Sequence, residues 1–210
     1  MTARKKGHSQ LPDEAAHAQL EQHVRSMLGL LGEDPSREGL HDTPARVSRA
    51  WAEWTAGYRM NPATILKSFE DGASHNDEMI IVRDLPIYSH CEHHLAPFFG
   101  HAHIAYIPAG RIVGLSKFGR LVDVFARRFQ VQERMTGQIA DAFFQRVQPA
   151  GVAVVARCRH MCMESRGIRV RNSSTITTAT RGIFATDTAK RNEFFVRLGM
   201  QAEGLPNYVD

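Results

Sequence analysis

Residues 89–95 read Ser-His-Cys-Glu-His-His-Leu and place one thiol, one carboxylate and three imidazoles within a short stretch. Each of these groups is costly to bury without a partner, so neither an ordinary core nor an ordinary surface explains the cluster. Cys91 and His94 stand three residues apart, which lets a tight turn present sulfur and nitrogen to one ion. Both are ligand types that zinc accepts. The stretch therefore predicts part of a metal site.

A third ligand has to come from elsewhere, and the other two cysteines of the chain, Cys158 and Cys162, flank His160. The β-branched, apolar run at 151–156 predicts a strand over residues 151–162, in which alternate side chains share a face. On such a strand all three side chains point the same way, so either cysteine can complete the site with the histidine beside it. Three protein ligands and a water are the pattern of a catalytic zinc, whereas four protein ligands make a structural one.

The composition is that of a folded, unexported chain. It has 210 residues, 43% of them hydrophobic, enough for one substantial core or a core with a small appendage. No apolar run approaches the ~18 residues of a membrane span, and no apolar segment follows the basic N-terminus. Cysteines beside histidines in such a chain favour thiols and metal over disulfides. We therefore expect a cytoplasmic protein with no membrane partner.

The two halves of the chain differ in charge. Residues 1–105 carry 10 Lys/Arg and 14 Asp/Glu, whereas residues 106–210 carry 16 and 8. A basic half indicates an anionic partner, unless it forms a solvated surface or a charged subunit interface. Because the chain lacks a nucleic-acid-binding motif and the basic–aromatic interleaving that stacks bases, we expect a small phosphorylated ligand and no nucleic acid.

Periodicity and turn residues divide the chain into a basic tail at 1–11, a helical region at 12–68 and an α+β domain at 69–210. The domain is expected to run strand, strand, two helices, strand, strand, helix, with antiparallel pairs. We expect helices at 12–31, 43–57, 116–129, 133–147 and 188–199, and strands at 79–88, 98–107, 112–115, 151–162 and 173–185.

Basic side chains gather where helices are expected to begin. Ser116, Lys117 and Arg120 cluster at one such start, where backbone N–H groups can hold phosphate, although no Walker motif is present. Arg46 lies in the first turn of another helix, either as an exposed residue or as a phosphate contact. Glu133 begins a third helix, where composition alone favours a capping carboxylate that complements the helix dipole over a functional group.

These motifs, in this order, resemble those of one family, GTP cyclohydrolase I, the zinc enzyme that opens pterin biosynthesis. The resemblance covers about residues 12–200, and the pairing of Cys-Glu-His-His with a distant His-x-Cys-Met is highly specific. The matching segments are Arg37-Glu-Gly-Leu40, Thr43-Pro-Ala-Arg-Val47, Ser89-x-Cys-Glu-His-His-Leu95, Gly114-Leu-Ser-Lys117 with Arg120, Gln132-Glu133, His160-x-Cys-Met163, Arg166-Gly167 and Ser174-Thr175.

The resemblance assigns roles residue by residue. The family's zinc ligands, for one zinc ion per subunit, correspond to Cys91, His94 and Cys162, which leaves Cys158 as a core thiol. Its catalytic histidines correspond to His93 and His160. Its substrate-binding residues correspond to Glu133, which reads the guanine, to Gln132 beside it, and to Ser116, Lys117, Arg120, Arg166 and Arg46 around the ribose and triphosphate.

The resemblance also implies a fold, an assembly and a reaction. The fold is the tunnelling fold, an antiparallel sheet with helices on one side, preceded by an N-terminal helical segment. The assembly is a homodecamer of two pentamers with active sites between subunits. The reaction opens the imidazole ring of GTP, releases formate and gives 7,8-dihydroneopterin triphosphate, the first step of folate and pterin biosynthesis. We expect His160 to protonate the ring nitrogen that leaves, with His93 assisting.

Other functions match the residues less well. A metalloprotease would need His-Glu-x-x-His, and a nucleoside deaminase would need Cys-x-x-Cys together with His-x-Glu; the chain has neither set. Other enzymes of the same fold have sites that resemble a three-histidine zinc site or a lone nucleophilic cysteine. The Cys/His/Cys set of this chain fits neither. A structural zinc scaffold is the alternative from another class, and it would have no need of His93, His160 and Glu133.

Overall fold

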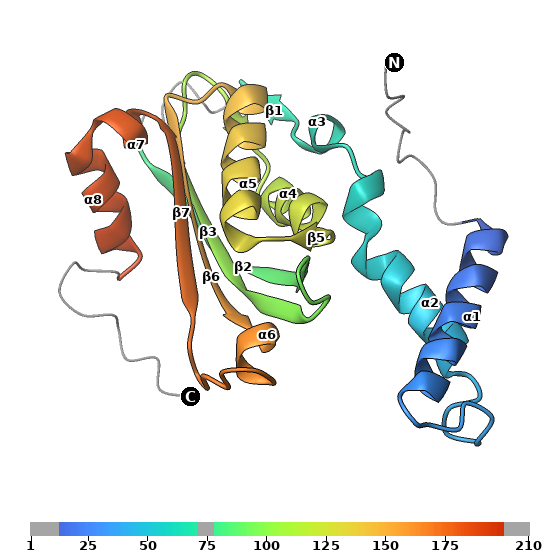
Figure 1. Cartoon of the computed structure of the whole chain (residues 1–210). Helices are drawn as coiled ribbons and strands as arrows, with labels where there is room; N and C mark the ends of the chain where they lie inside the picture. The colour runs from blue at the N-terminus through green and yellow to red at the C-terminus, as the bar shows by residue number, and fades with distance from the viewer. Residues whose placement is uncertain (1–12, 71–77, 200–210) are drawn as a thin grey trace, which may run out of the picture. The chain divides into compact units, whose positions relative to one another are not determined.

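The structure, a computed structural model, describes residues 13–70 and 78–199 and divides the chain into two compact units, 1–60 and 61–210 (Figure 1). The basic tail expected at 1–11 and the extension after residue 200 lie outside the described residues. Within these ranges no helix is both long and apolar enough to cross a bilayer.

The N-terminal unit contains two packed helices, as the sequence predicts. They are α1 (Glu14–Leu30) and α2 (Thr43–Trp54), followed by the 3-10 helix η1 (Ala56–Arg59). Asp13 caps α1 by accepting a hydrogen bond from the backbone N–H of Ala16 at 2.8 Å. Between the helices, His17 Nδ1 lies 2.6 Å from Ser48 Oγ, which satisfies a fully buried hydroxyl.

The larger unit holds a five-stranded sheet in the order β5-β2-β3-β6-β7 and a two-stranded sheet of β1 and β4. The strands are β1 (Ser68–Phe69), β2 (Ile80–Cys91), β3 (Pro97–Ile107), β4 (Ile112–Val113), β5 (Phe129–Gln130), β6 (Gly151–His160) and β7 (Thr175–Gly182). The helices are α3 (Pro62–Ile65), α4 (Ser116–Ala126), α5 (Gln132–Val147), α6 (Met161–Glu164), α7 (Ile183–Thr186) and α8 (Thr188–Arg197). The α+β class is thus confirmed.

The main core lies between one face of the large sheet and the helices α4 and α5 (Figure 1). Tyr106 of β3 points to this side, with its ring centroid 5.8 Å from that of Phe118 on α4 and 5.2 Å from that of Phe143 on α5. Its hydroxyl accepts a hydrogen bond from the backbone N–H of Val113 at 3.3 Å. Tilted aromatic contacts of this kind bury the largest side chains of the unit and fix both helices on the sheet.

A second, smaller core forms on the opposite face, which the sequence did not predict. Ala105 and Val155 alternate with the residues of the main core and pack against Phe184, Phe194 and Leu198 of the C-terminal helical segment. Since side chains along a strand point alternately to its two faces, α8 covers part of the face that α4 and α5 leave open.

Three predicted strand details are wrong. The strand expected over 151–162 ends at His160, because Met161–Glu164 form the helical turn α6. The strand expected over 173–185 ends at Gly182, whose φ of 61° turns the chain into α7. Phe129, expected to end a helix, and Gln130, expected to interrupt it, instead form β5, which runs parallel to the end of β2. A strand of two residues is too short to produce a periodic pattern in the sequence, so β5 is recognised only by its pairing with β2 in the folded chain.

Candidate metal centre and active site

Three potential metal ligands converge at one end of the large sheet. The Sγ atoms of Cys91 and Cys162 and a ring nitrogen of His94 all lie within 4.8 Å of one another. Cys91 ends β2, and Cys162 follows the end of β6 by two residues. Because β3 pairs antiparallel with both of these strands, β2 and β6 run in the same direction and finish at the same end of the sheet.

A tight turn after β2 brings the first two ligands together. The backbone carbonyl of Cys91 accepts hydrogen bonds from the N–H groups of His94 and Leu95 at 3.3 and 2.8 Å. Leu95 adopts the left-handed region with φ of 55°, which reverses the chain within these few residues. The turn places Cys91 Sγ 4.0 Å from Nδ1 of His94. The three-residue spacing therefore acts as the sequence predicted.

The donor set fits a zinc ion. With Zn–S and Zn–N bonds of about 2.3 and 2.0 Å, ligand atoms around a tetrahedral zinc lie roughly 3.5–4 Å apart. Burial and the neighbouring Cys91 raise the pKa of Cys162, because two sulfur anions repel each other unless a cation lies between them. The described residues supply three ligands to this cluster. Three is the number that leaves one position of a tetrahedral ion open.

Cys158 lies outside the cluster. It is buried on β6, with 1% of its surface exposed, and burial raises the pKa of its thiol to about 12. A thiol that resists deprotonation is a poor metal ligand. The spacing alone left Cys158 and Cys162 as alternatives; the structure brings Cys162 to the other two ligands because the strand ends before it.

His160 is held at the end of β6 by two contacts. Its ring stacks on that of Phe98 from β3, with centroids 4.7 Å apart and planes 9° from parallel. Its Nε2 lies 2.8 Å from Oε1 of Gln132. Burial lowers the pKa of His160, and the carboxylate of Glu133 opposes this effect. The side chain is therefore a fixed imidazole, two residues before the candidate ligand Cys162. Phe98 was not predicted, because by sequence it is an ordinary core residue.

Gln132 is buried, with 1% of its surface exposed, although the resemblance groups it with the substrate-binding residues. Its Nε2 donates to the backbone oxygens of Ala156 and Thr175 at 3.0 and 2.9 Å, and lies 3.1 Å from Oγ1 of Thr177. Its side-chain contacts thus join α5 to β6, β7 and His160.

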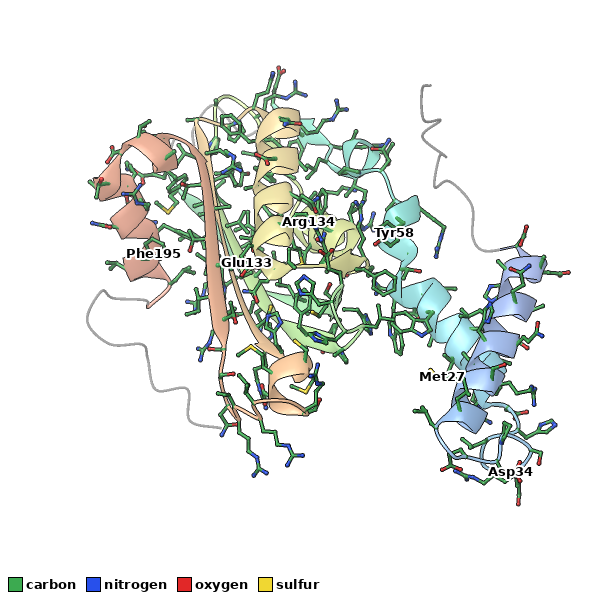
Figure 2. All side chains as sticks on the ribbon, viewed as in Figure 1. Met27, Asp34, Tyr58, Glu133, Arg134 and Phe195 are labelled. Atoms are coloured by element: carbon green, nitrogen blue, oxygen red, sulfur yellow. The ribbon has the colours of Figure 1, made fainter. Side chains whose placement is uncertain are left out.

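His93 and Glu92 complete the surroundings of the cluster. Nδ1 of His93 lies 3.9 Å from Sγ of Cys91. Glu92 forms an ion pair with Arg134 of α5, which lowers the pKa of the Glu92 carboxyl. Figure 2 places Glu133 and Arg134 next to each other on α5. The ion pair ties the ligand-bearing turn to this helix. It was not predicted, because nothing in the local sequence connects partners 42 residues apart.

The remaining predicted site residues are polar groups at helix ends. Glu133 is exposed in the first turn of α5 and lies near enough to His160 to influence its pKa. Arg166 is exposed just after α6, and its positive charge lowers the pKa of Cys162 against the larger effect of burial. The start of α4 carries the residues expected to bind phosphate, whose side chains are exposed or half-buried: Ser116, Lys117 and Arg120.

Arg46 belongs to the other unit. It is exposed in the first turn of α2, and its guanidinium lies 3.1 Å from the carboxylate of Asp42. An exposed pair of this kind contributes little to stability, so the arginine can be drawn to a stronger anion at low cost.

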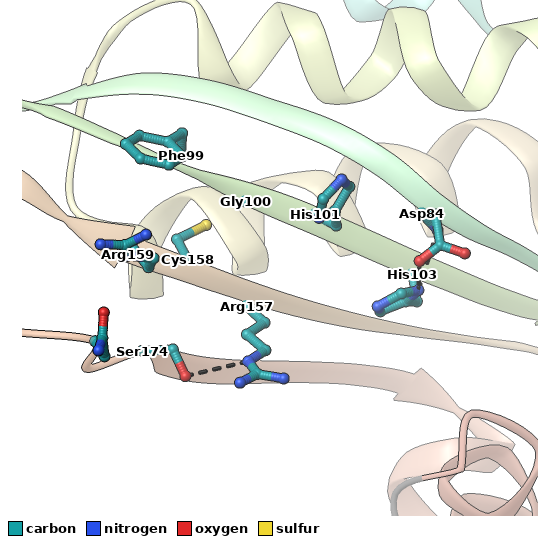
Figure 3. Close-up of a pocket in the computed structure, with 10 residues that line it drawn as sticks. Asp84, Phe99, Gly100, His101, His103, Arg157, Cys158, Arg159 and Ser174 are labelled. Carbon is teal, nitrogen blue, oxygen red and sulfur yellow. Dashed lines mark hydrogen bonds and ion pairs between the residues drawn. The ribbon is translucent and has the colours of Figure 1, made fainter. Parts of the chain in front are cut away.

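A cavity of about 750 Å³ is lined mainly by residues of β3 and β6 (Figure 3). Phe99 and Arg159, which line it, alternate along their strands with Phe98 and His160, so the sheet separates the cavity from the histidine. The cavity also receives His103, whose Nδ1 accepts a hydrogen bond from the backbone N–H of Asp84 at 3.1 Å. It is therefore distinct from the metal cluster.

Acidification is expected to destabilise the fold through His103. Burial lowers its pKa, Arg83 and His101 add to this effect, and the Asp84 carboxylate opposes it. The folded protein thus binds this proton less readily than the unfolded chain, whose histidines titrate near pH ~6.5. The free energy of unfolding is unaffected by this group above that pH and decreases as the pH falls through it.

Thermal denaturation followed between about pH 7.5 and about pH 5 measures this effect. His103→Gln, which keeps an acceptor for the Asp84 N–H, should lose less Tm over this range than the wild type. His23→Gln, at an exposed position of α1 that does not act on His103, is the control and should follow the wild type. If His103→Gln shows the wild-type slope, this histidine does not contribute to the pH dependence.

A family model and several curated relatives that match this chain carry the same description. A family model described as GTP cyclohydrolase I matches residues 20–199. The chain is 60% identical over 168 residues to GTP cyclohydrolase 1 of Nitrosospira multiformis, covering 80% of this chain and 88% of the relative. It is 53% identical over 178 residues to GTP cyclohydrolase 1 of Mycolicibacterium vanbaalenii, covering 84% and 87%. The relative of the same name in Campylobacter jejuni is 53% identical over 174 residues, covering 82% and 90%.

Among solved structures, the apo form of the archaeosine synthase QueF-Like aligns with a TM-score of 0.40 and 19% sequence identity. The alignment covers 50% of this chain and 93% of that structure.

Proposed function

The chain belongs to the GTP cyclohydrolase I family, and from this premise we propose that Cys91, His94 and Cys162 hold its zinc ion, one per chain. The activity is that of the family: the imidazole ring of GTP is opened, formate is released and 7,8-dihydroneopterin triphosphate is formed, at the start of folate and pterin biosynthesis. The convergence of two thiols and one imidazole within 4.8 Å is the observation that carries the zinc assignment. When bound, zinc supplies a water acidic enough to react near neutral pH.

His160 is assigned to proton transfer, with His93 assisting. Two fixed contacts orient the His160 ring, and burial lowers its pKa, which favours the neutral imidazole that can accept a proton and return it. It delivers the proton to the guanine ring nitrogen that leaves when the five-membered ring opens. Nδ1 of His93 lies 3.9 Å from Sγ of Cys91, and the side chain is exposed, so that it can contact the substrate.

Glu133 is assigned to guanine recognition. Its carboxylate is exposed at the start of α5 and lies near His160, so the base it binds lies next to the proton-transfer group. A carboxylate accepts from both N1–H and the 2-amino group of guanine. Adenine has no such pair of donors, and a site built on paired polar groups discriminates steeply against it. We therefore expect GTP and not ATP to be the substrate.

The triphosphate is assigned to Lys117, Arg120 and Arg166, with Ser116 beside them at the start of α4. These groups are exposed or half-buried, and the Arg166 side chain lies near Cys162. Arginine and lysine form charge-assisted hydrogen bonds with phosphate oxygens. Arg46 of the N-terminal unit is assigned to the same anion by the family resemblance alone.

Arg166→Ala is expected to weaken the binding of GTP about 10–100-fold, the value of a lost hydrogen bond between charged groups. Guanosine, which has no phosphate, should bind the variant nearly as well as the wild type. Competition of both ligands against a fluorescent GTP analogue measures the two affinities. Arg146→Ala, an exposed arginine in the last turn of α5, is the control for a general loss of positive charge. Equal losses for GTP and guanosine would contradict a phosphate contact.

We infer the assembly from the family as well: a homodecamer of two pentamers with active sites between subunits, built on the tunnelling fold, in the cytoplasm. Large apolar side chains of the N-terminal unit support an assembly, because Leu30 and Leu31 are 88% and 74% exposed. Analytical ultracentrifugation of the full chain tests the oligomer. A monomer that turns over GTP at its full rate would rule out active sites between subunits.

The activity is tested by incubating the purified full chain with GTP, with and without a chelator. Formate and, after oxidation, pterin fluorescence are measured together. Both products should appear, disappear with the chelator and return with zinc. Formate without pterin would mean ring opening without reclosure. Neither product from folded, zinc-loaded protein would indicate a structural zinc scaffold.

A further inference from the structure

The orientation of the Gln132 side-chain amide is set by its surroundings. Its nitrogen has three oxygens within hydrogen-bonding distance, and two of them are the backbone carbonyls of Ala156 and Thr175. Carbonyl oxygens only accept, so the amide has to direct its N–H bonds toward them. The reverse orientation would face oxygen against oxygen inside a buried site. The Gln132 oxygen must therefore be the atom that faces His160.

That oxygen determines the tautomer of His160. Oε1 of Gln132 can only accept, and it lies 2.8 Å from Nε2 of the imidazole. Nε2 therefore carries the hydrogen, and Nδ1 is the unprotonated nitrogen of the neutral ring. The parallel ring of Phe98 keeps the plane of the imidazole fixed. Together the two contacts specify both the orientation of the ring and the position of its proton.

We propose that Gln132 is a positioning residue that holds His160 as its Nε2–H tautomer, so that Nδ1 is the atom that exchanges a proton with the substrate. This inference rests on the proposed role of His160. It gives Gln132 a function other than the guanine contact suggested by the resemblance, because both N–H bonds and the oxygen of the buried amide are engaged within the protein.

The arrangement tolerates both protonation states of the histidine. When Nδ1 takes up a proton, Nε2–H still donates to Oε1 of Gln132, so the hydrogen bond persists while the charge changes. The ring then returns the proton from Nδ1 to the leaving nitrogen without rotating. A histidine that kept its orientation through the cycle would avoid a reorganisation step at each turnover.

Gln132→Met tests the proposal, because methionine has a similar length and neither hydrogen-bonding group. The kcat should fall about 100-fold, the cost of a misplaced catalytic group, while KM for GTP and zinc content stay near the wild type. Thr136→Val is the matched control. Thr136 is buried one turn along α5, and its hydroxyl lies 2.8 Å from the Gln132 carbonyl and 2.7 Å from Thr177 Oγ1. It should leave kcat unchanged.

Nitrogen-15 solid-state NMR of the sedimented, zinc-loaded full chain gives a readout independent of activity. Signals of labelled His160 are identified by their loss in His160→Gln. The wild type should show a protonated Nε2 and an unprotonated Nδ1, and Gln132→Met should show mixed tautomers. Gln132→Leu, which also lacks both amide groups, serves if the methionine variant fails to fold and should show the same mixed tautomers.

Three results would overturn the proposal. One is a wild-type His160 with its proton on Nδ1. Another is Gln132→Met with both tautomer and kcat unchanged. The third is a rise in KM for GTP with kcat preserved, which would restore Gln132 to substrate binding. If the wild type releases no formate, the proposed function fails, while the NMR result still decides whether Gln132 sets the tautomer.

Discussion

Replacing Cys162 with alanine is expected to abolish zinc binding and turnover together. The variant leaves Cys91 and His94 as a two-ligand site, and zinc sites in proteins are built from three or four protein ligands. The loss of activity should exceed 100-fold, since altering even the partners of metal ligands costs about 10–100-fold. Zinc per chain measured by mass spectrometry, together with formate release from GTP, checks both effects.

Cys158→Ala is the matched control for this experiment. Both residues are cysteines of the same segment, but Cys158 is buried on β6 and lies outside the cluster. This variant should keep its zinc and its turnover and lose only about 1 kcal/mol of stability from the small cavity. If zinc were instead lost from Cys158→Ala and retained by Cys162→Ala, the ligand assignment would be reversed.

His160→Gln is expected to keep the zinc and lose turnover by about 100- to 10,000-fold, the usual contribution of a positioned acid–base group. Glutamine can still fill the space on Phe98 and bond to Gln132, but its amide does not carry a proton to the substrate. The two measurements separate the two effects, because zinc content reports whether the ligand cluster is intact and kcat reports the proton transfer.

The measurement pairs zinc content with single-turnover formation of formate, and His101→Gln serves as the control. His101 is an exposed histidine of β3 on the cavity side of the sheet. It should leave both quantities unchanged. A His160→Gln variant with wild-type kcat would remove the acid–base role, and one that also lost zinc would show that the histidine supports the metal site.

The cluster explains why both variants act on one centre. Cys91 ends β2, and His94 lies in the turn after it. His160 ends β6, and Cys162 lies in α6 directly after it. The register pairs His90 with Pro97 and His160 with Phe98, so both ends flank the first residues of β3. A shift of one residue in either register would turn the side chains to the opposite face. The sheet therefore fixes the distance between metal and imidazole.

Local chemistry alone determined much of this protein. The apolar periodicity at 12–31 and 188–199 predicted helices that the structure contains, and β-branched runs predicted β2, β3, β6 and β7. The spacing of Cys91 and His94 predicted a tight turn with two ligands. These features succeed because helices, strands and tight turns depend on neighbouring residues, whose order the sequence states directly.

Contacts between distant segments were decided only by the tertiary structure. Composition could not choose between Cys158 and Cys162, because the choice depends on where β6 ends and α6 begins. Nothing local to Gln132 indicates that its amide is buried against β6 and β7 and directs its oxygen to His160. The sequence names the groups that can ligate a metal or carry a proton. Their distances, burial and tautomers follow from strand register and packing, which join residues far apart in the chain.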